Sequence, residues 1–211
     1  MKKILLTLLL CGIVGTTFSQ EEDDNSLLVF LHGGCGFLPS KTSGLTSSSP
    51  SYVDELSVGA IWNAQAYFRH KMLITGLLYS GYTANGSLAY SSDRILTTYL
   101  APQLGMDIPI ADRRVEIAFN AGIGSMWYRN YSVVFEKDRN VKKNTIGLNF
   151  GLKGVYNFTP HFGVSLEMSA ITASVSSVEI QYHDYNTLKV NYADPLYLNQ
   201  INFAIGLKYS L

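Results

Sequence analysis

Apolar and polar residues alternate along several segments of the chain. Every second residue from Leu56 to Phe68 is apolar, while the residues between them are mostly small or polar. The same alternation recurs at 115–124, 145–153 and 201–211. Because successive side chains of a strand point to opposite faces, this period of two predicts strands rather than helices.

Less regular alternation elsewhere brings the number of predicted strands to eight. They lie at about 26–38, 53–69, 72–83, 94–108, 113–130, 143–158, 162–180 and 198–211. Segments 39–52, 84–93, 131–142 and 181–197 are long and rich in Ser, Asn, Asp and Lys, whereas 69–71, 109–112 and 159–161 are short turns. Long and short links that alternate along the chain are typical of barrels that cross an outer membrane. We therefore predict an all-β fold, an eight-stranded antiparallel up-and-down transmembrane β-barrel.

Composition indicates which face of this barrel points outward. Charged residues make up 15% of the chain, against about 25% in a typical soluble domain. The polar face consists mainly of Gly, Ala, Ser, Asn and Thr, whereas a soluble lipocalin-type barrel, the alternative, has many Lys and Glu outside. Aromatic residues lie near the predicted strand ends, as in the aromatic belts of membrane proteins: Phe68, Phe158, Phe162 and Tyr209 at the short turns, and Tyr82, Trp127 and Tyr131 at the long links.

The first nineteen residues have the layout of a secretory signal peptide. Lys2 and Lys3 precede an apolar run from Ile4 to Val14, and small residues precede a cut after Ser19. Residues 1–19 are therefore predicted to be a signal peptide and residues 20–211 the barrel domain. Lipoprotein processing at Cys11 is the alternative.

The carboxyl end of the chain resembles the terminal assembly signal of outer-membrane β-barrels. Gly206, Tyr209 and Leu211 match its glycine, aromatic and terminal hydrophobic positions, although Leu replaces the more usual Phe or Trp. Across 26–211 the chain resembles the small OmpX/OmpA-type, porin-like barrels. The resemblance implies location in the outer membrane of a Gram-negative-type envelope, contact with outer-membrane lipid, and recognition of the C-terminal strand by the barrel-assembly machinery.

Six charged residues are predicted to point into the lumen near the short turns. They are Arg69, Asp107, Glu116, Lys153, Glu167 and Lys208, three of each sign. The predicted strand order places Lys153 opposite Glu167 and brings Lys208 to the other side of Glu167. Because a buried charge needs a partner, we expect a structural Lys153–Glu167–Lys208 cluster. A gated path for protons or ions is the alternative.

Residues with catalytic or metal-binding chemistry are few and dispersed. His183, beside Asp184 and near Ser176 and Ser177, is the one outward histidine that could act with a nucleophile, and the spacing of the four histidines gives no two-ligand metal motif. We therefore expect no enzyme activity, metal or cofactor.

The expected function is a non-enzymatic envelope-structural or adhesin-like role, with a surface ligand held by the long loops. Sixteen basic and sixteen acidic residues give no net charge, which argues against nucleic-acid binding. A narrow pore and an outer-membrane lipid-modifying enzyme are the alternatives. Fold alone does not choose among them.

Overall fold

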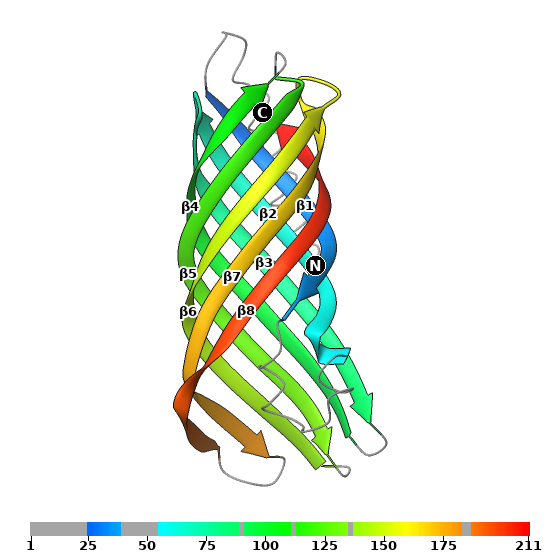
Figure 1. Cartoon of the computed structure of the whole chain (residues 1–211), viewed down its shortest axis with the longest axis vertical. Coiled ribbons are helices and arrows are strands. Elements are labelled where there is room, and N and C mark those ends of the chain that lie inside the picture. The colour runs from blue at the N-terminus through cyan, green and yellow to red at the C-terminus, as the bar shows by residue number, and fades with distance from the viewer. Residues whose placement is uncertain (1–24, 39–54, 89–90, 111–112, 135–136, 183–186) are drawn as a thin grey trace, which may run out of the picture.

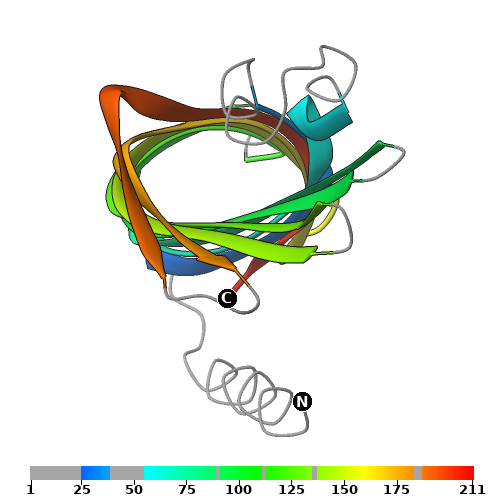
Figure 2. The same cartoon turned by 90° about the horizontal axis from the view of Figure 1, so that it is seen from below.

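The eight strands form one closed antiparallel barrel. The computed structural model describes residues 25–38, 55–88, 91–110, 113–134, 137–182 and 187–211. The strands are β1 (Asn25–Phe37), β2 (Val58–His70), β3 (Leu73–Leu88), β4 (Ser91–Ile110), β5 (Val115–Val134), β6 (Lys137–Asn157), β7 (Phe162–Tyr182) and β8 (Leu188–Ser210). Each strand pairs with its neighbour in sequence, and β8 pairs with β1, which closes the ring (Figures 1 and 2). Among the described residues, no helix is both long and apolar enough to cross a membrane.

Three of the predicted long links are mostly strand. β3 and β4 continue to Leu88 and from Ser91, so the loop predicted at 84–93 is wrong, and the loops predicted at 131–142 and 181–197 are wrong for the same reason. These segments are polar and lack strict alternation, yet hairpin pairing with the neighbouring strand supplies their hydrogen bonds. At the predicted start of the second strand, residues 55–57 form a helical turn, and the strand begins at Val58. The fourth predicted loop, 39–52, lies outside the described residues.

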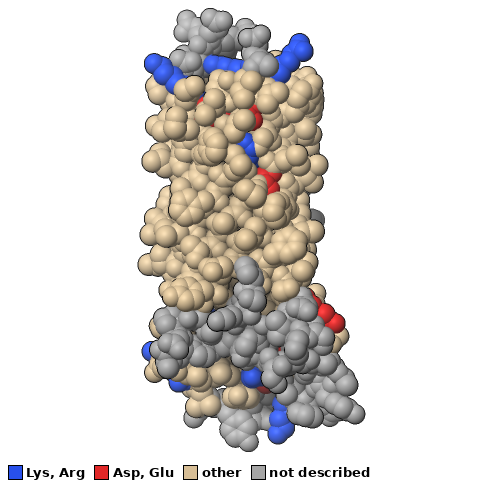
Figure 3. Space-filling view, in the orientation of Figure 1, with Lys and Arg blue, Asp and Glu red and all other residues tan. Residues whose placement is uncertain are grey.

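The apolar face of the strands lies on the outside of the barrel. Ile146, Leu166 and Ile205 are each more than 60% exposed, and apolar side chains of all eight strands surround them. Figure 3 shows a broad band of uncharged residues over the middle of one face, with most Lys and Arg toward its two ends. A soluble barrel would bury this surface, so the exposed side chains fit an apolar surrounding.

The lumen has two unlike halves. Near the short turns it holds the charged residues, whereas toward the long links it holds a cluster of eighteen buried hydrophobic residues, including Tyr82, Tyr99 and Tyr128. The prediction that Tyr82 belongs to an outer aromatic belt is therefore wrong, because its side chain is fully buried inside. The prediction that small polar residues line the lumen is also wrong for this half, because inward positions of β4, β5 and β7 carry Ile, Tyr, Met and Val.

The three residues of the terminal signal lie where β8 closes the barrel. Gly206 pairs with His32 of β1, and a methyl group on Gly206 would lie 2.2 Å from the Leu31 carbonyl oxygen. The Tyr209 ring packs at 4.9 Å from the Phe162 ring of β7. The backbone of Leu211 exchanges two hydrogen bonds with Leu27, at 2.9 and 3.0 Å. The contacts of Gly206 and Leu211 join β8 to β1, and that of Tyr209 holds β8 against β7.

Candidate functional site

Four charged side chains form a network in the lumen, close to the short turns. We call this network the lower tier, although the short turns lie at the top of Figure 1. The Arg69 guanidinium lies 3.0 Å from Asp107 Oδ2 and 3.2 Å from Glu116 Oε1. The Lys208 ammonium contacts Glu116 and donates a hydrogen bond to Asn157 Oδ1 at 3.2 Å. The four charged residues are at most 9% exposed and come from β2, β4, β5 and β8, so the network ties opposite walls of the barrel together.

The other two predicted lumen charges form a second group, which lies farther from the short turns. We call this group the upper tier. Lys153 Nζ lies 3.8 Å from Glu167 Oε2, on directly paired residues of β6 and β7. The Glu167 carboxylate accepts hydrogen bonds from Asn63 Nδ2 at 3.1 Å and from Gln65 Nε2 at 2.7 Å, and Lys153 donates to Gln65 Oε1. Two amides of β2 therefore complete the pair across the lumen.

Two aromatic rings support the buried ammonium group. Lys153 is 0% exposed, and its Nζ lies 4.2 Å from the centre of the Phe30 ring and 4.5 Å from that of Tyr67. Ring faces attract a cation, most strongly where water is excluded. Lys153 is thus held by one carboxylate, one amide oxygen and two rings.

The predicted three-membered cluster is wrong in its third member. Lys208 lies on Glu116 rather than beside Glu167. On β8 it pairs with Gly163, four residues before Glu167 on β7, because Lys208 is only two residues from the end of its strand. The tier in which a charged residue lies therefore depends on its distance along the strand from the short turn, and not only on which strand is its neighbour.

The sequence reasoning missed His32, which lies in the upper tier. Its Nε2 is 2.8 Å from Ser165 Oγ and its Nδ1 is 3.6 Å from Glu167 Oε2. Leu28 and Phe30 of β1 point inward, so His32, two residues farther on, should point inward too. Apolar and polar residues alternate only weakly in that strand, which hides the pattern. The three groups follow the order of a nucleophile, a base and an orienting carboxylate. Ser165 is only 1% exposed, however, so a substrate could reach it only if the lumen opened.

Amide side chains fill the cross-section beyond the upper tier. Gln103 donates to Asn149 Oδ1 at 2.7 Å and accepts from Asn120 at 2.8 Å, and Gln200 donates to Asn202 Oδ1 at 2.7 Å. The apolar cluster follows toward the long links. Charged and amide side chains, with a small apolar cluster around Phe30 and Tyr67, therefore fill the part of the lumen nearer the short turns, and the larger apolar cluster fills the rest.

The remaining candidate residues lie apart from this network. His70 and His161 are exposed at the short turns, while His183 and Asp184 lie outside the described residues. Ser176 is exposed and Ser177 buried on β7. Cys35 is exposed on the outer face of β1. Within the described part of the chain, no three His, Cys, Asp or Glu side chains come together as metal ligands.

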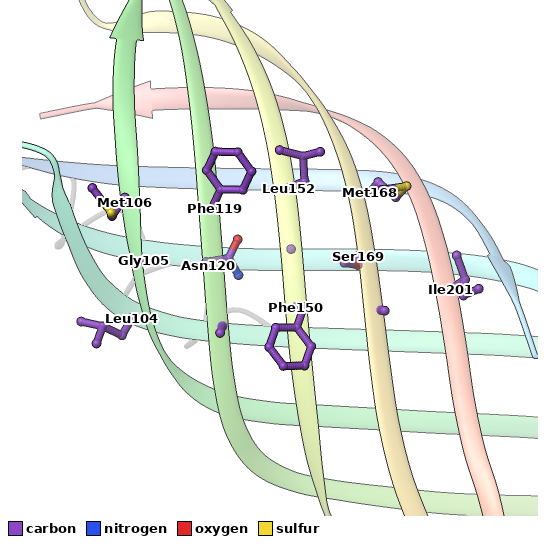
Figure 4. A pocket seen from close by; sticks show the side chains of 13 residues that line it. Leu104, Gly105, Met106, Phe119, Asn120, Phe150, Leu152, Met168, Ser169 and Ile201 are labelled. Atoms are coloured by element: carbon purple, nitrogen blue, oxygen red, sulfur yellow. The ribbon is translucent and has the colours of Figure 1, made fainter.

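One hollow of about 680 Å³ lies in the middle of the outer apolar face. Figure 4 shows it between the row of Met106, Phe119, Leu152 and Met168 and the row that contains Leu104, Phe150 and Ile201. Gly105, Asn120 and Ser169 lie between the two rows, and Gly151, which also lines the hollow, lies between Phe150 and Leu152 in sequence. Small side chains beside large ones thus leave an apolar depression across β4–β8.

Comparison with known proteins identifies the fold. No family model matches the chain, and no curated protein matches it in sequence. A major outer membrane protein from Thermus thermophilus has a similar structure, with a TM-score of 0.60 and 12% identity over 89% of this chain and 99% of that one.

Two further solved structures have a similar fold. Neisserial surface protein A gives a TM-score of 0.51 with 10% identity, over 90% of this chain and 99% of that one. The outer membrane protease OmpT from Escherichia coli gives 0.50 with 9% identity, over 93% and 100%. The protein has the fold of outer-membrane β-barrels.

Proposed function

We propose that the protein is a non-enzymatic outer-membrane barrel that presents a binding surface to the cell exterior. On this proposal residues 1–19 are a signal peptide, the apolar outer face contacts outer-membrane lipid, and the C-terminal strand is recognised by the barrel-assembly machinery. The exposed apolar side chains of all eight strands support the membrane location. The filled lumen argues against a pore, since the passage of ions would require many buried side chains to move. It favours a barrel that holds the binding surface in the membrane.

The observation that carries the surface role is that β3 to β8 continue past the ends of β1 and β2. Pairing of β1 with β8 ends at Phe37 and Ile201, so residues 188–191 and 196–200 of β8 pair only with β7 among the described residues. Residues 84–88 of β3 have only β4 as a strand partner there, although the Ser87 backbone N–H donates a hydrogen bond to Glu55 Oε2 at 3.1 Å. These two edges lie in the hairpins at the lower end of Figure 1. An unpaired strand edge can add an extended segment of another protein.

The β8 edge also exposes apolar side chains. Leu188 is 55% exposed and Val190 36%, and both face residues of β7 whose side chains are more buried. Apolar residues beside free backbone groups are the usual components of strand addition. Lysine residues on an edge oppose it, and the one lysine between these two residues, Lys189, lies directly opposite Glu179 of β7, which offsets its charge.

Charging this edge is expected to abolish surface binding. We would produce the protein in Gram-negative cells that lack it and measure their adhesion to an epithelial monolayer and to one another. The wild-type chain should raise at least one of these several-fold. The double variant Leu188→Lys, Val190→Lys should return it to the level of cells without the protein, because two lysines oppose an added strand.

The matched control is Tyr131→Lys, Val133→Lys, which makes the same change at exposed positions of β5, a strand paired on both sides. It should keep adhesion within twofold of wild type. Equal adhesion with and without the wild-type protein, or equal loss in both double variants, would contradict the proposal.

A further inference from the structure

Four charged side chains form a row across the outer face of β5 to β8, and we call them the basic row. Arg129 pairs with Lys142, Lys142 with Glu179, and Glu179 with Lys189, each on the neighbouring strand. All four are exposed. Arg94 of β4, also exposed, lies two residues beyond the level of the row. The row carries three positive charges and one negative charge.

The basic row lies immediately past the apolar band. On β5, Trp127 is the next outward residue from Arg129 toward the short turns. On β6, Ile146, which is 69% exposed, lies four residues from Lys142 in the same direction. Tryptophan favours the boundary between hydrocarbon and headgroups. On β5 the row therefore lies one outward residue past Trp127, and Tyr131 and Val133 lie farther out.

The depth of the row corresponds to that of lipid phosphates. Ala121, in the middle of the outward apolar residues of β5, lies eight residues from Arg129, and Phe150 lies eight residues from Lys142. At about 3.3 Å per residue and a strand tilt of about 40°, this spacing is about 20 Å along the barrel axis. Half of a bilayer of about 40–45 Å, headgroups included, has the same thickness.

The charges of the row call for an anion. Arg129 and Lys142 are like charges directly across a strand pair, where side chains lie about 5 Å apart and repel each other. A phosphate between them would remove that repulsion, and the arginine could bind it through two parallel hydrogen bonds. Glu179 balances only one of the three cations.

We propose that the basic row binds the phosphate of a phosphorylated lipid in the outer leaflet, while the acyl chains descend along β5 and β6 toward the hollow of Figure 4. The proposal rests on the proposed membrane location. The hollow lies about 20 Å below the row, at the depth that the ends of such chains reach. The site would select lipids by their phosphate charge and leave the rest of the headgroup free in the aqueous layer.

Lipid quenching of Trp127 tests this directly. The full chain with Trp62→Phe keeps Trp127 as its one tryptophan, because the sequence has two. We would insert it into vesicles with brominated chains on either phosphatidic acid or phosphatidylcholine and obtain the relative binding constant from the quenching. Phosphatidic acid should bind about 25-fold more tightly, since each basic residue near a membrane surface strengthens anionic binding about fivefold and the row has a net of two positive charges.

The double variant Arg129→Gln, Lys142→Gln should reduce this preference to about one, because only Lys189 and Glu179 remain in the row. The control Lys71→Gln, Arg114→Gln removes two exposed charges at the short turns and should leave the preference intact. Equal binding of the two lipids, or a preference that survives the double variant, would overturn the proposal. Inorganic phosphate should weaken the preference no more than sodium chloride of the same ionic strength; a loss specific to phosphate would overturn the proposal in favour of a free-anion site. If neither brominated lipid quenches Trp127, the membrane location itself fails, which is a distinguishable result.

Discussion

Glu167→Gln will destabilise the barrel by about 3 kcal/mol, the low end of the range for breaking a buried ion pair. Lys153 has no exposed surface, and Glu167 is the carboxylate that contacts it. The substitution also replaces one of two acceptor oxygens by an amide nitrogen, so Asn63 or Gln65 loses its hydrogen-bond acceptor. Unfolding by urea in phospholipid vesicles, followed by tryptophan fluorescence, measures the loss.

Two further variants isolate the cause of that loss. Arg114→Gln removes an exposed charge at a short turn and should change the free energy of unfolding by less than about 0.5 kcal/mol. Lys153→Met in the Glu167→Gln background removes the unpaired ammonium and should restore most of the stability, since an apolar replacement of a buried pair is often neutral. A Glu167→Gln variant as stable as wild type would refute the upper-tier pair as a structural element.

Phe150→Arg will destabilise the protein in lipid by about 3 kcal/mol. Phe150 is 59% exposed in the middle of the apolar face. An arginine at the mid-plane of a bilayer costs about 2–4 kcal/mol, whereas an exposed substitution on a water-soluble barrel changes stability by less than about 0.5 kcal/mol. The same urea titration in vesicles distinguishes these outcomes.

Asn144→Arg is the control for this variant, because it places the same charge on the same strand and face, six residues nearer the long links. Its cost should fall to about 0–1 kcal/mol near the interface. If Phe150→Arg costs no more than Asn144→Arg, the outer face is not in hydrocarbon and the membrane assignment is wrong.

The faces of the strands follow from the sequence because side-chain direction in a strand has a fixed period of two. That rule places Trp62 and Phe68 outside and Arg69, Lys153 and Glu167 inside, as the structure has them. The rule fails where segments are polar on both faces, so the outer parts of β5 to β8 resemble loops in sequence. Pairing between long hairpins holds them as strands.

The partners of the lumen charges depend on distances that alternation does not contain. Two residues near the ends of their strands meet across the lumen, as Arg69 and Glu116 do, even though β2 and β5 are not neighbours. Counting residues from each short turn separates Lys208 from Glu167, and the same count would have grouped Lys208 with Glu116. The contacts of His32 with Ser165 and Glu167 required the register of β1 against β8, which its weak alternation leaves open in the sequence.

The electrophoretic mobility of the protein from an outer-membrane fraction, before and after boiling in SDS, tests most simply whether the chain forms a closed membrane barrel. A closed barrel with a filled lumen and an apolar exterior should resist the detergent and migrate faster without boiling. Boiling should unfold it and give a single slower band at the position expected from the chain length. A protein found soluble in the periplasm, with one mobility in both samples, would contradict the account.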